Sequence, residues 1–254
     1  MVKAKKYLGQ HFLNDKNIAS KIANMLVNND KLNVLEIGPG TGILTNELIN
    51  LGHKLTLIEI DKESVEFLNN NYENKFILIE GDFIKLNLKD IFDGDFCIIG
   101  NFPYNISSQI FFKILDNRDQ IPEIVCMIQK EVAERISAKH GNKTYGILSV
   151  LLQLFFKIEY LFTVSENVFL PPPKVKSAVI RLTRYRSNID TIDIKKLILI
   201  VKTAFNQRRK KLSNSLSNLL IDKSLKDLPI FQLRPEQLSP EDFIELTKIV
   251  SGLL

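Results

Sequence analysis

The stretch "NVLEIGPGTG", residues 33–42, joins an apolar run to three closely spaced glycines, Gly38, Gly40 and Gly42. A segment with helix-forming character follows over residues 43–50. A glycine turn of this kind lets a ligand lie against the main chain at the carboxyl end of a strand, because glycine has no Cβ. The stretch predicts a ligand-binding strand–turn–helix unit, with a tight turn that binds nothing as the alternative.

Strand-like and helix-like segments alternate around this turn. We expect strands at 33–37, 54–60, 75–81, 95–100 and 123–129, and helices at 14–28, 43–50, 61–72, 105–115, 130–138 and 145–156. The helix at 105–115 is expected to start behind an Asn or Ser cap. The strands are nearly all apolar, which is typical of a parallel sheet covered on both faces.

Two further strand-like runs, 158–164 and 177–185, are joined through "FLPPP" and suit an antiparallel edge pair. With them, the chain is expected to form an α/β fold with a Rossmann-like, seven-stranded sheet.

The pattern changes near Ser187. From residue 190 onward only helical segments are expected, at 194–206, 210–220 and 239–254, the last starting at Ser239 or Pro240. We therefore expect a first domain over residues 1–187, in which residues 1–30 form an N-terminal segment that covers the ligand. A small all-α domain is expected over residues 188–254.

Composition narrows the class of protein. The 254 residues carry a net charge of +5, and the excess gathers in two basic runs near the chain ends. Basic runs suit a polyanion, and a solvated helix surface is the alternative. Cys97 and Cys126 lie in apolar runs, as expected of reduced core cysteines, and no Cys/His spacing predicts a metal site. No membrane-spanning run is visible, so we expect a cytoplasmic protein.

Two acidic residues follow strands in the order that a nucleoside ligand requires. Glu59 ends the second expected strand, where its carboxylate can accept hydrogen bonds from a ribose diol, and Asp82 follows the third, where it can accept one from an adenine amino group. The spacing G-x-G-x-G, with Glu36 before it, is typical of methyltransferases that bind S-adenosylmethionine, which has no pyrophosphate. For each acid alone, a solvated turn or helix cap is the alternative.

The stretch "GNFPYNIS", residues 100–107, follows the fourth expected strand and so shares the edge of the glycine turn. The amine of adenine is a poor nucleophile, because its lone pair is delocalised. The side-chain oxygen of Asn101 and a carbonyl at Phe102 or Pro103 can accept its N–H hydrogen bonds, and Pro103 stiffens the turn. Tyr104 can stack on the base. A proline turn with a half-buried tyrosine is the alternative.

These motifs together resemble the ribosomal RNA adenine-N6,N6-dimethyltransferase family, and within it the bacterial 16S enzymes associated with kasugamycin resistance. The resemblance extends over nearly the whole chain. It rests on "KKYLGQHFLND", "EIGPGTG", "IEID", "GNFPYNIS", "QKEVAERI", "YGILSV", "FLPPPKVKSAVIRL" and "AFNQRRKKLSNSL", which appear in family order. Phe102 stands where the family often has leucine, and its side chain is expected to pack rather than react.

The resemblance implies roles for individual residues. Cofactor-binding positions carry over to His11, Leu13, Gly38, Gly40, Glu59, Asp82 and Asn101. The target-amine motif falls on Asn101, Pro103 and Tyr104, and Phe169 is expected as a second wall of a base sandwich, with a core aromatic as the alternative. RNA-binding is expected of Lys5, Lys6, Arg208, Arg209, Lys210 and Lys211. Residues 1–30 are expected to cover the RNA and the cofactor. His11 is expected to have no part in proton transfer.

The resemblance also implies a reaction and its partners. We expect dimethylation, by S-adenosylmethionine, of N6 on two adjacent adenines in the 3′-terminal hairpin of 16S RNA. The expected partner is 16S ribosomal RNA in the precursor of the 30S subunit, and the enzyme is expected to act as a monomer without a metal. The alternatives are a 23S methyltransferase of the macrolide-resistance type and a noncatalytic assembly factor. A DNA adenine methyltransferase is disfavoured, because no target-recognition insertion of the usual size is visible.

Overall fold

The computed structural model describes residues 2–27, 32–72, 75–220 and 222–253. The chain divides into two compact units. The first consists of Met1–Ala133 and Lys157–Tyr185, and the second of Glu134–Phe156 and Arg186–Leu254.

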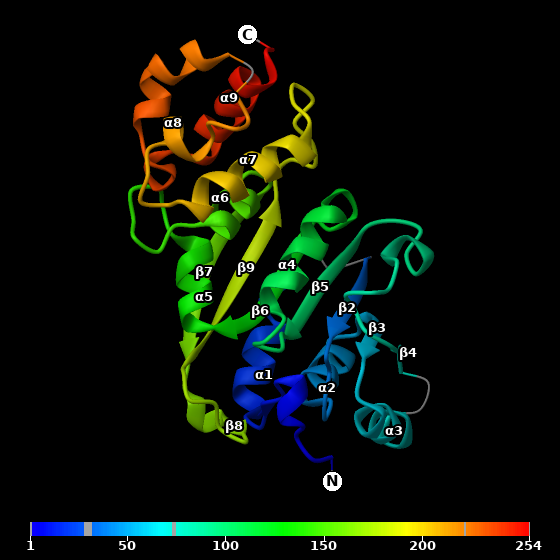
Figure 1. Cartoon of the computed structure of the whole chain (residues 1–254). Coiled ribbons are helices and arrows are strands. Elements are labelled where there is room, and N and C mark those ends of the chain that lie inside the picture. Colours follow the sequence, from blue (N-terminus) through cyan, green and yellow to red (C-terminus); the bar gives the residue numbers. More distant parts are fainter. Residues whose placement is uncertain (1, 28–31, 73–74, 221, 254) are drawn as a thin grey trace. The chain divides into compact units, whose positions relative to one another are not determined.

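The first unit is built on a seven-stranded sheet with the order β4-β3-β2-β5-β6-β9-β7 (Figure 1). The strands are β2 (Asn33–Ile37), β3 (Lys54–Glu59), β4 (Ile77–Glu80), β5 (Phe96–Asn101), β6 (Glu123–Gln129), β7 (Phe156–Val164) and β9 (Ser177–Arg184). Strands β2 to β6 pair in parallel, and β9 runs antiparallel to β6, with Cys126 opposite Ile180. The expected α/β fold and its seven strands are confirmed.

Burial along the strands follows their place in the sheet. In β2, β5 and β6, almost every side chain is buried, which explains their unbroken apolar sequences. Strand β4 forms one edge and leaves Ile77 exposed, and β7 forms the other. The two runs expected to pair at an edge lie at this end of the sheet, with β9 between β6 and β7. Cys97 and Cys126 are free and buried, as expected.

The helices of this unit follow the strands in the expected order. They are α1 (Lys16–Ala23), α2 (Ile43–Asn50), α3 (Lys62–Asn71) and α4 (Ser107–Asp116), and α5 (Lys130–Ser137) begins in this unit and ends in the second. Helix α1 is shorter than the expected 14–28, of which residue 28 lies outside the described residues. The expected Asn or Ser cap of α4 is wrong: Ile106 occupies that position without a side-chain bond, because Ser107 already lies inside the helix.

A pair of short strands was not visible in the sequence. β1 (Phe12–Leu13) pairs antiparallel with β8 (Phe169–Leu170), so that Leu13 lies opposite Phe169. Two-residue strands carry too few residues to show a period of two, and this explains why only the structure reveals them.

The second unit is helical. It contains α6 (Ile147–Gln153), α7 (Ile194–Asn206), α8 (Leu212–Ser215), α9 (Pro240–Ser251) and the 3-10 helices η5 (Lys223–Asp227), η6 (Pro229–Gln232) and η7 (Pro235–Gln237). Ser239 caps α9 and Pro240 is its first residue, as expected. The helix expected over 210–220 is only α8, because the serines and asparagines of this segment form helices poorly. Residue 254 lies outside the described residues.

The units depart from the expected division at residue 187 in one respect. Residues 134–156 pack with the C-terminal helices, because α6 buries Leu148, Val150, Leu151 and Leu152 and contacts α7 and α9. Helix α6 also ends before the expected residue 156, which is already part of β7. No helix in the described ranges is both long and apolar enough to cross a membrane.

Gly100 generates a stability prediction, because β5 passes close to the end of β2. A Cβ at this position would lie 2.6 Å from the carbonyl oxygen of Ile37, a backbone atom that cannot move aside alone. We expect Gly100→Ala to lower the free energy of unfolding by about 1–3 kcal/mol in urea titrations. Gly94→Ala is the matched control, because a Cβ there meets no atom within 4 Å. Equal effects of both substitutions would contradict the close approach.

Candidate active site

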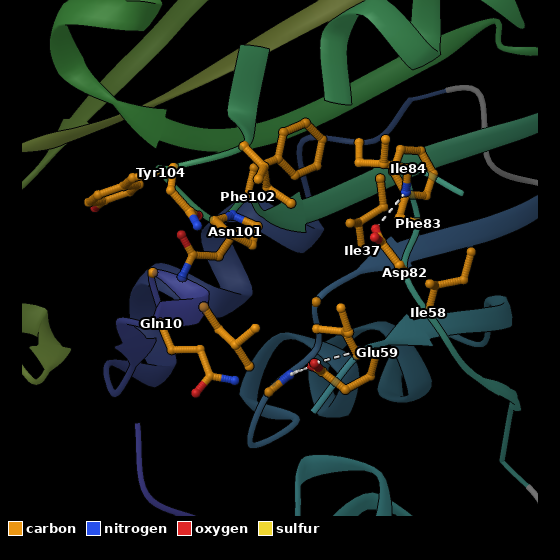
Figure 2. A pocket seen from close by; sticks show the side chains of 18 of the residues that line it. Gln10, Ile37, Ile58, Glu59, Asp82, Phe83, Ile84, Asn101, Phe102 and Tyr104 are labelled. Carbon is orange, nitrogen blue, oxygen red and sulfur yellow. Dashed lines mark hydrogen bonds between the residues drawn. The ribbon is translucent and has the colours of Figure 1, made fainter. Parts of the chain in front are cut away.

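The first unit contains a cavity of about 300 Å³ at the carboxyl ends of β2, β3, β4 and β5. Its lining includes the N-terminal residues 8–12, the glycine turn, Glu59, Asp82 and residues 101–106. Figure 2 shows Asn101 and Tyr104 on one side of the cavity and Glu59 and Asp82 on the other. The parallel sheet thus gathers residues from four separate motifs at one edge, as the order of the motifs predicted.

Glu59 fastens the glycine turn to the second strand. Its Oε2 accepts a hydrogen bond from Gly40 N at 3.0 Å, and its Oε1 accepts bonds from Ile60 N and Asp61 N, both at 2.9 Å. Burial raises the pKa of Glu59, and the three backbone bonds oppose this shift. Oε2 keeps lone-pair capacity for a hydroxyl group in the cavity, as a ribose-binding carboxylate requires.

Gly40 explains why the turn needs glycine. Its φ is +58°, and a Cβ would lie 2.8 Å from the ring of Phe12. The turn therefore packs against the N-terminal segment, which the sequence did not reveal. Gly38 also lines the cavity, and its N–H donates to Ile58 O at 3.0 Å.

Glu36 is a second buried carboxyl group, one strand away from Glu59. It is 1% exposed, and Thr45 Oγ1 donates a hydrogen bond to its Oε2 at 2.7 Å. Burial raises the pKa of Glu36 to about 8, partly opposed by the Thr45 bond. Glu36 lines a small cavity of about 30 Å³ together with Leu13 and Asn101. Leu13 is therefore near the site, although it is buried in the core and does not line the larger cavity.

Asp82 lies at the end of the cavity that the third strand reaches. Its Oδ1 accepts from Ile84 N at 3.0 Å, and its Oδ2 lies 3.8 Å from Lys85 Nζ. Asp82 therefore stabilises a turn, which is the alternative that the sequence left open. It also lines the cavity. Phe83 and Ile84 form apolar walls beside it. Sequence analysis did not identify Phe83 and Ile84 as site residues. The signal that could have identified them is their place directly after the "GD" motif.

Asn101 is the last residue of β5, and the nitrogen and the oxygen of its side-chain amide differ in their hydrogen bonding. Its Nδ2 donates to the carbonyl of His11 at 2.9 Å. Its Oδ1 is buried and has no hydrogen-bond partner in the described part of the chain. Because a buried acceptor without a partner costs about 1–3 kcal/mol, this oxygen marks a position where a ligand donor is expected.

The residues after Asn101 hold the backbone in place. Phe102 N donates to Met127 O at 3.0 Å, and the fully buried Phe102 ring packs against Phe111 at 5.9 Å between centroids. The Pro103 carbonyl accepts from Ile106 N at 3.2 Å, whereas no described residue donates to the Phe102 carbonyl. Of the two carbonyls left open by the sequence, that of Phe102 therefore keeps both lone pairs free of donors from the described residues. The Phe102 side chain packs in the core against Phe111, as expected.

Tyr104 and His11 form an aromatic wall. Their rings are stacked with centroids 5.4 Å apart and an interplanar angle of 29°. The Tyr104 hydroxyl bonds to Ser177 Oγ, and burial raises the pKa of Tyr104. His11 Nδ1 lies 2.8 Å from Pro171 O, which fixes the ring. His11 therefore contributes a stacking ring and, from its backbone, a carbonyl that accepts from Asn101.

Phe169 is not brought to this cavity. It is 3% exposed, pairs with Leu13 across the two short strands and belongs to the core of the first unit. Strand alternation exposes its neighbour Leu170 instead. Phe169 therefore does not form the expected second wall of a base sandwich, and the core aromatic that the sequence left as an alternative is what the structure contains.

Three of the six basic residues expected to bind RNA form bonds within the fold. Lys5 forms an ion pair with Asp61, Arg208 Nη2 donates to Asn142 O at 3.2 Å, and Lys211 Nζ donates to Gln232 Oε1 at 3.0 Å. These contacts use donors that the sequence assigned to phosphate. The other three cations, Lys6, Arg209 and Lys210, are exposed.

Comparison with known proteins identifies the family. The family model for ribosomal RNA adenine dimethylases matches residues 1–249. The chain belongs to this family. It is 58% identical over 252 residues to ribosomal RNA small subunit methyltransferase A of Parabacteroides distasonis, covering 98% of this chain and 94% of the relative. The corresponding protein of Flavobacterium johnsoniae is 56% identical over 253 residues, covering 99% and 97%.

Solved structures agree with this family. A dimethyladenosine transferase from Plasmodium falciparum matches with a TM-score of 0.76 and 27% identity, covering 93% of this chain and 96% of that one. The 23S rRNA methyltransferase ErmE shares the fold, with a TM-score of 0.68, 24% identity and coverage of 94% and 99%. The family that the motifs indicated is confirmed, and the protein is an S-adenosylmethionine-dependent methyltransferase.

The cavity residues fit S-adenosylmethionine. Glu59 offers a carboxylate oxygen, and Asp82 offers another beside apolar walls. Asn101 lines both this cavity and the smaller one, and its Oδ1 has no partner among the residues that the structure describes. When bound, this cofactor supplies an electrophilic methyl group on a sulfonium. We propose that His11, Leu13, Gly38, Gly40, Glu59, Asp82 and Asn101 hold it.

Glu36 generates a prediction about pH. Its folded pKa of about 8 lies above its ordinary value of 4.5, so the fold favours the protonated form. Its stabilising contribution is complete below pH 4.5 and is lost as the pH rises through 8, on the order of 5 kcal/mol in total. We expect the free energy of unfolding to fall less between pH 5 and 8.5 in Glu36→Gln than in the wild type. Urea titrations measure this, with the exposed Glu66→Gln as control, and identical pH slopes would exclude the shift.

Proposed function

We propose that this enzyme dimethylates N6 of two adjacent adenines in the 3′-terminal hairpin of 16S ribosomal RNA, within the assembling small subunit. The observation that carries the proposal is the buried Oδ1 of Asn101 at the carboxyl edge of the sheet, which has no hydrogen-bond partner within the described ranges. The names of the relatives, which are ribosomal RNA small subunit methyltransferases, support the choice of RNA.

The proposed chemistry uses two fixed acceptors. Asn101 Oδ1 and the Phe102 carbonyl accept hydrogen bonds from the exocyclic amine, which shifts electron density onto the nitrogen. The target adenine must leave its stack to reach them, and Tyr104 offers a ring against which it can stack. No general base is required before transfer, because the nitrogen can lose its proton to water afterwards. The amine is thus activated by position and polarisation.

Two alternatives make different predictions. A 23S methyltransferase shares the fold, as the likeness to ErmE illustrates, but the relatives at 53–58% identity are named for the small subunit. A noncatalytic assembly factor would have no need of the Asn-Phe-Pro-Tyr motif, which is complete here. We further propose that the enzyme works as a monomer in the cytoplasm on a precursor of the 30S subunit.

The experiment that tests this function uses purified protein, radiolabelled S-adenosylmethionine and immature 30S particles. Dimethyladenine should appear, and primer extension should stop at two adjacent adenines near the 3′ end of 16S RNA. A stop in 23S RNA, when 50S particles are supplied, would support the first alternative. No dimethyladenine on either particle would support the second.

For RNA binding, we propose that the exposed cations Arg209 and Lys210, together with Lys6, contact phosphates. Arg208 and Lys211 bond to neighbours within their own unit, so their main contribution is to hold the turn that presents Arg209 and Lys210. Phosphate contacts position a protein on RNA without reading its sequence.

Asn101→Ala tests the amine-acceptor role. We expect the rate of methyl transfer at saturating cofactor and RNA to fall by roughly 10²-fold or more, because one pre-organised polar group is removed from the reacting atoms. RNA binding, measured by filter retention, should change little. Asn70→Ala, on the exposed face of α3, is the control. Equal losses of rate and of RNA affinity would contradict the role.

Replacing both Arg209 and Lys210 with Ala tests the phosphate contacts. We expect weaker binding to 30S particles and a salt dependence of the affinity that is flatter by about 0.7–0.9 in slope for each phosphate that the variant no longer neutralises. The double substitution Lys195→Ala/Lys223→Ala removes the same charge from exposed sites of the same unit. If both double variants flatten the slope equally, the effect is one of net charge and the specific contacts are refuted.

A further inference from the structure

The N-terminal residues 5–13, which we call the strap, connect the two sides of the cavity. Residues 8–12 line the cavity directly. Figure 2 shows Gln10 on the same side as Asn101 and Tyr104, with Glu59 across from them. The strap is held at two anchors outside it, and it forms at least one specific polar contact with each.

The first anchor is Asp61, directly after β3. Its carboxyl group is 2% exposed, forms an ion pair with Lys5 Nζ and accepts from Gln10 Nε2 at 3.1 Å. Gln10 is oriented from its other end as well, because Lys5 N donates to Gln10 Oε1 at 2.8 Å. Burial acts to raise the pKa of Asp61, but the bonds from Lys5 and Gln10 hold it below its ordinary value. Asp61 is thus an ionised group that fixes two strap residues.

The second anchor is the loop that carries the target-amine motif. The carbonyl of His11, next to Gln10, accepts the hydrogen bond from Asn101 Nδ2 at 2.9 Å. Gly9 approaches the same loop so closely that a Cβ would lie 2.5 Å from Asn105 Oδ1. The strap therefore touches the loop at two nearby points.

The His11 bond decides which way the Asn101 amide faces. The two ends of an amide have nearly the same shape and differ only in donating or accepting. With Nδ2 held by a carbonyl, Oδ1 is left to accept from the amine of the base. If the strap is loose, the Asn101 amide can rotate. Its N–H groups then face the N–H groups of the base amine, and two donors cannot form a hydrogen bond.

We propose that Asp61 is a positioning residue, which through Lys5 and Gln10 holds the strap so that the His11 carbonyl orients Asn101 with Oδ1 as the acceptor. Neither Asp61 nor Lys5 lines the cavity, so their influence on the site passes through the strap. The orientation follows from the contacts alone, whereas its effect on methyl transfer rests on the proposed function. In this arrangement, Lys5 holds the strap to Asp61 and does not serve as a phosphate ligand.

The first test is spectroscopic and needs no activity. The full chain is labelled with 15N-asparagine, and the Asn101 side-chain resonances are assigned by their loss in Asn101→Ala. In the wild type, we expect Nδ2 protons that exchange slowly with water. Lys5→Met and Asp61→Asn should each raise the exchange rate roughly tenfold or more, since the local opening of the strap becomes easier.

Matched variants separate anchoring from folding. Lys5→Arg keeps the ion pair and should keep slow exchange, while Lys16→Met removes one exposed charge outside the strap and should change nothing. Lys5→Met and Lys5→Arg both leave the buried Asp61 in place, so a folding defect of Asp61→Asn does not prevent the test. Unchanged Asn101 exchange in Lys5→Met would overturn the proposal.

The second test is a double-mutant cycle in single-turnover methyl transfer at saturating cofactor and RNA. Lys5→Met should slow the wild type roughly ten- to a hundredfold, because a small misplacement at the reacting atoms is costly. In the Asn101→Ala background, the same change should have an effect of less than about twofold, since the group it positions is absent.

Other outcomes of these two tests would contradict either the positioning role or the proposed function. If Lys5→Met slows transfer equally in both backgrounds, the strap acts on cofactor or RNA instead of on Asn101, and the proposal is wrong. If it only weakens RNA binding and flattens its salt dependence, Lys5 is a phosphate ligand after all. If the exchange result holds but no RNA is methylated by the wild type, the positioning stands and the proposed function fails.

Discussion

The site depends on one hydrogen bond, from Asn101 Nδ2 to the carbonyl of His11. This bond satisfies the donor end of a buried amide and leaves its acceptor end without a partner among the described residues. An unpaired buried acceptor is a cost to the fold that a ligand with an N–H group can relieve. In the proposed function, the amine of adenine is this ligand, and it supplies the hydrogen bond that Asn101 Oδ1 lacks within the described part of the chain.

The bond in turn requires that distant segments meet at one edge of the sheet. Parallel strands place Gly40, Glu59, Asp82 and Asn101 at their carboxyl ends, and the N-terminal segment closes over them. Glu59 bonds to the glycine turn and to the backbone of Asp61, whose side chain holds Lys5 and Gln10. The residues proposed to bind the cofactor and the proposed amine acceptor therefore belong to one hydrogen-bonded structure.

The residues whose surroundings the sequence did not reveal share a physical feature: each has a partner far along the chain. Lys5 looked like a phosphate ligand, but a buried carboxylate 56 residues away engages it. Phe169 looked like a stacking wall, but pairing with Leu13 turns it into the core. Residues 134–156 looked like part of the first domain, but α6 packs with helices that follow residue 186.

The sequence by itself determined the α/β class, the strand ends that carry the cofactor motifs and the Asn-Phe-Pro-Tyr turn, because strand periodicity, glycine spacing and short polar motifs are local properties. Only the tertiary structure decided which end of the Asn101 amide is bonded within the fold, which cations form contacts inside their own unit and which residues the N-terminal segment contacts. Hydrogen bonds and ion pairs between distant residues settle these questions, and no local pattern of residue types encodes such pairings.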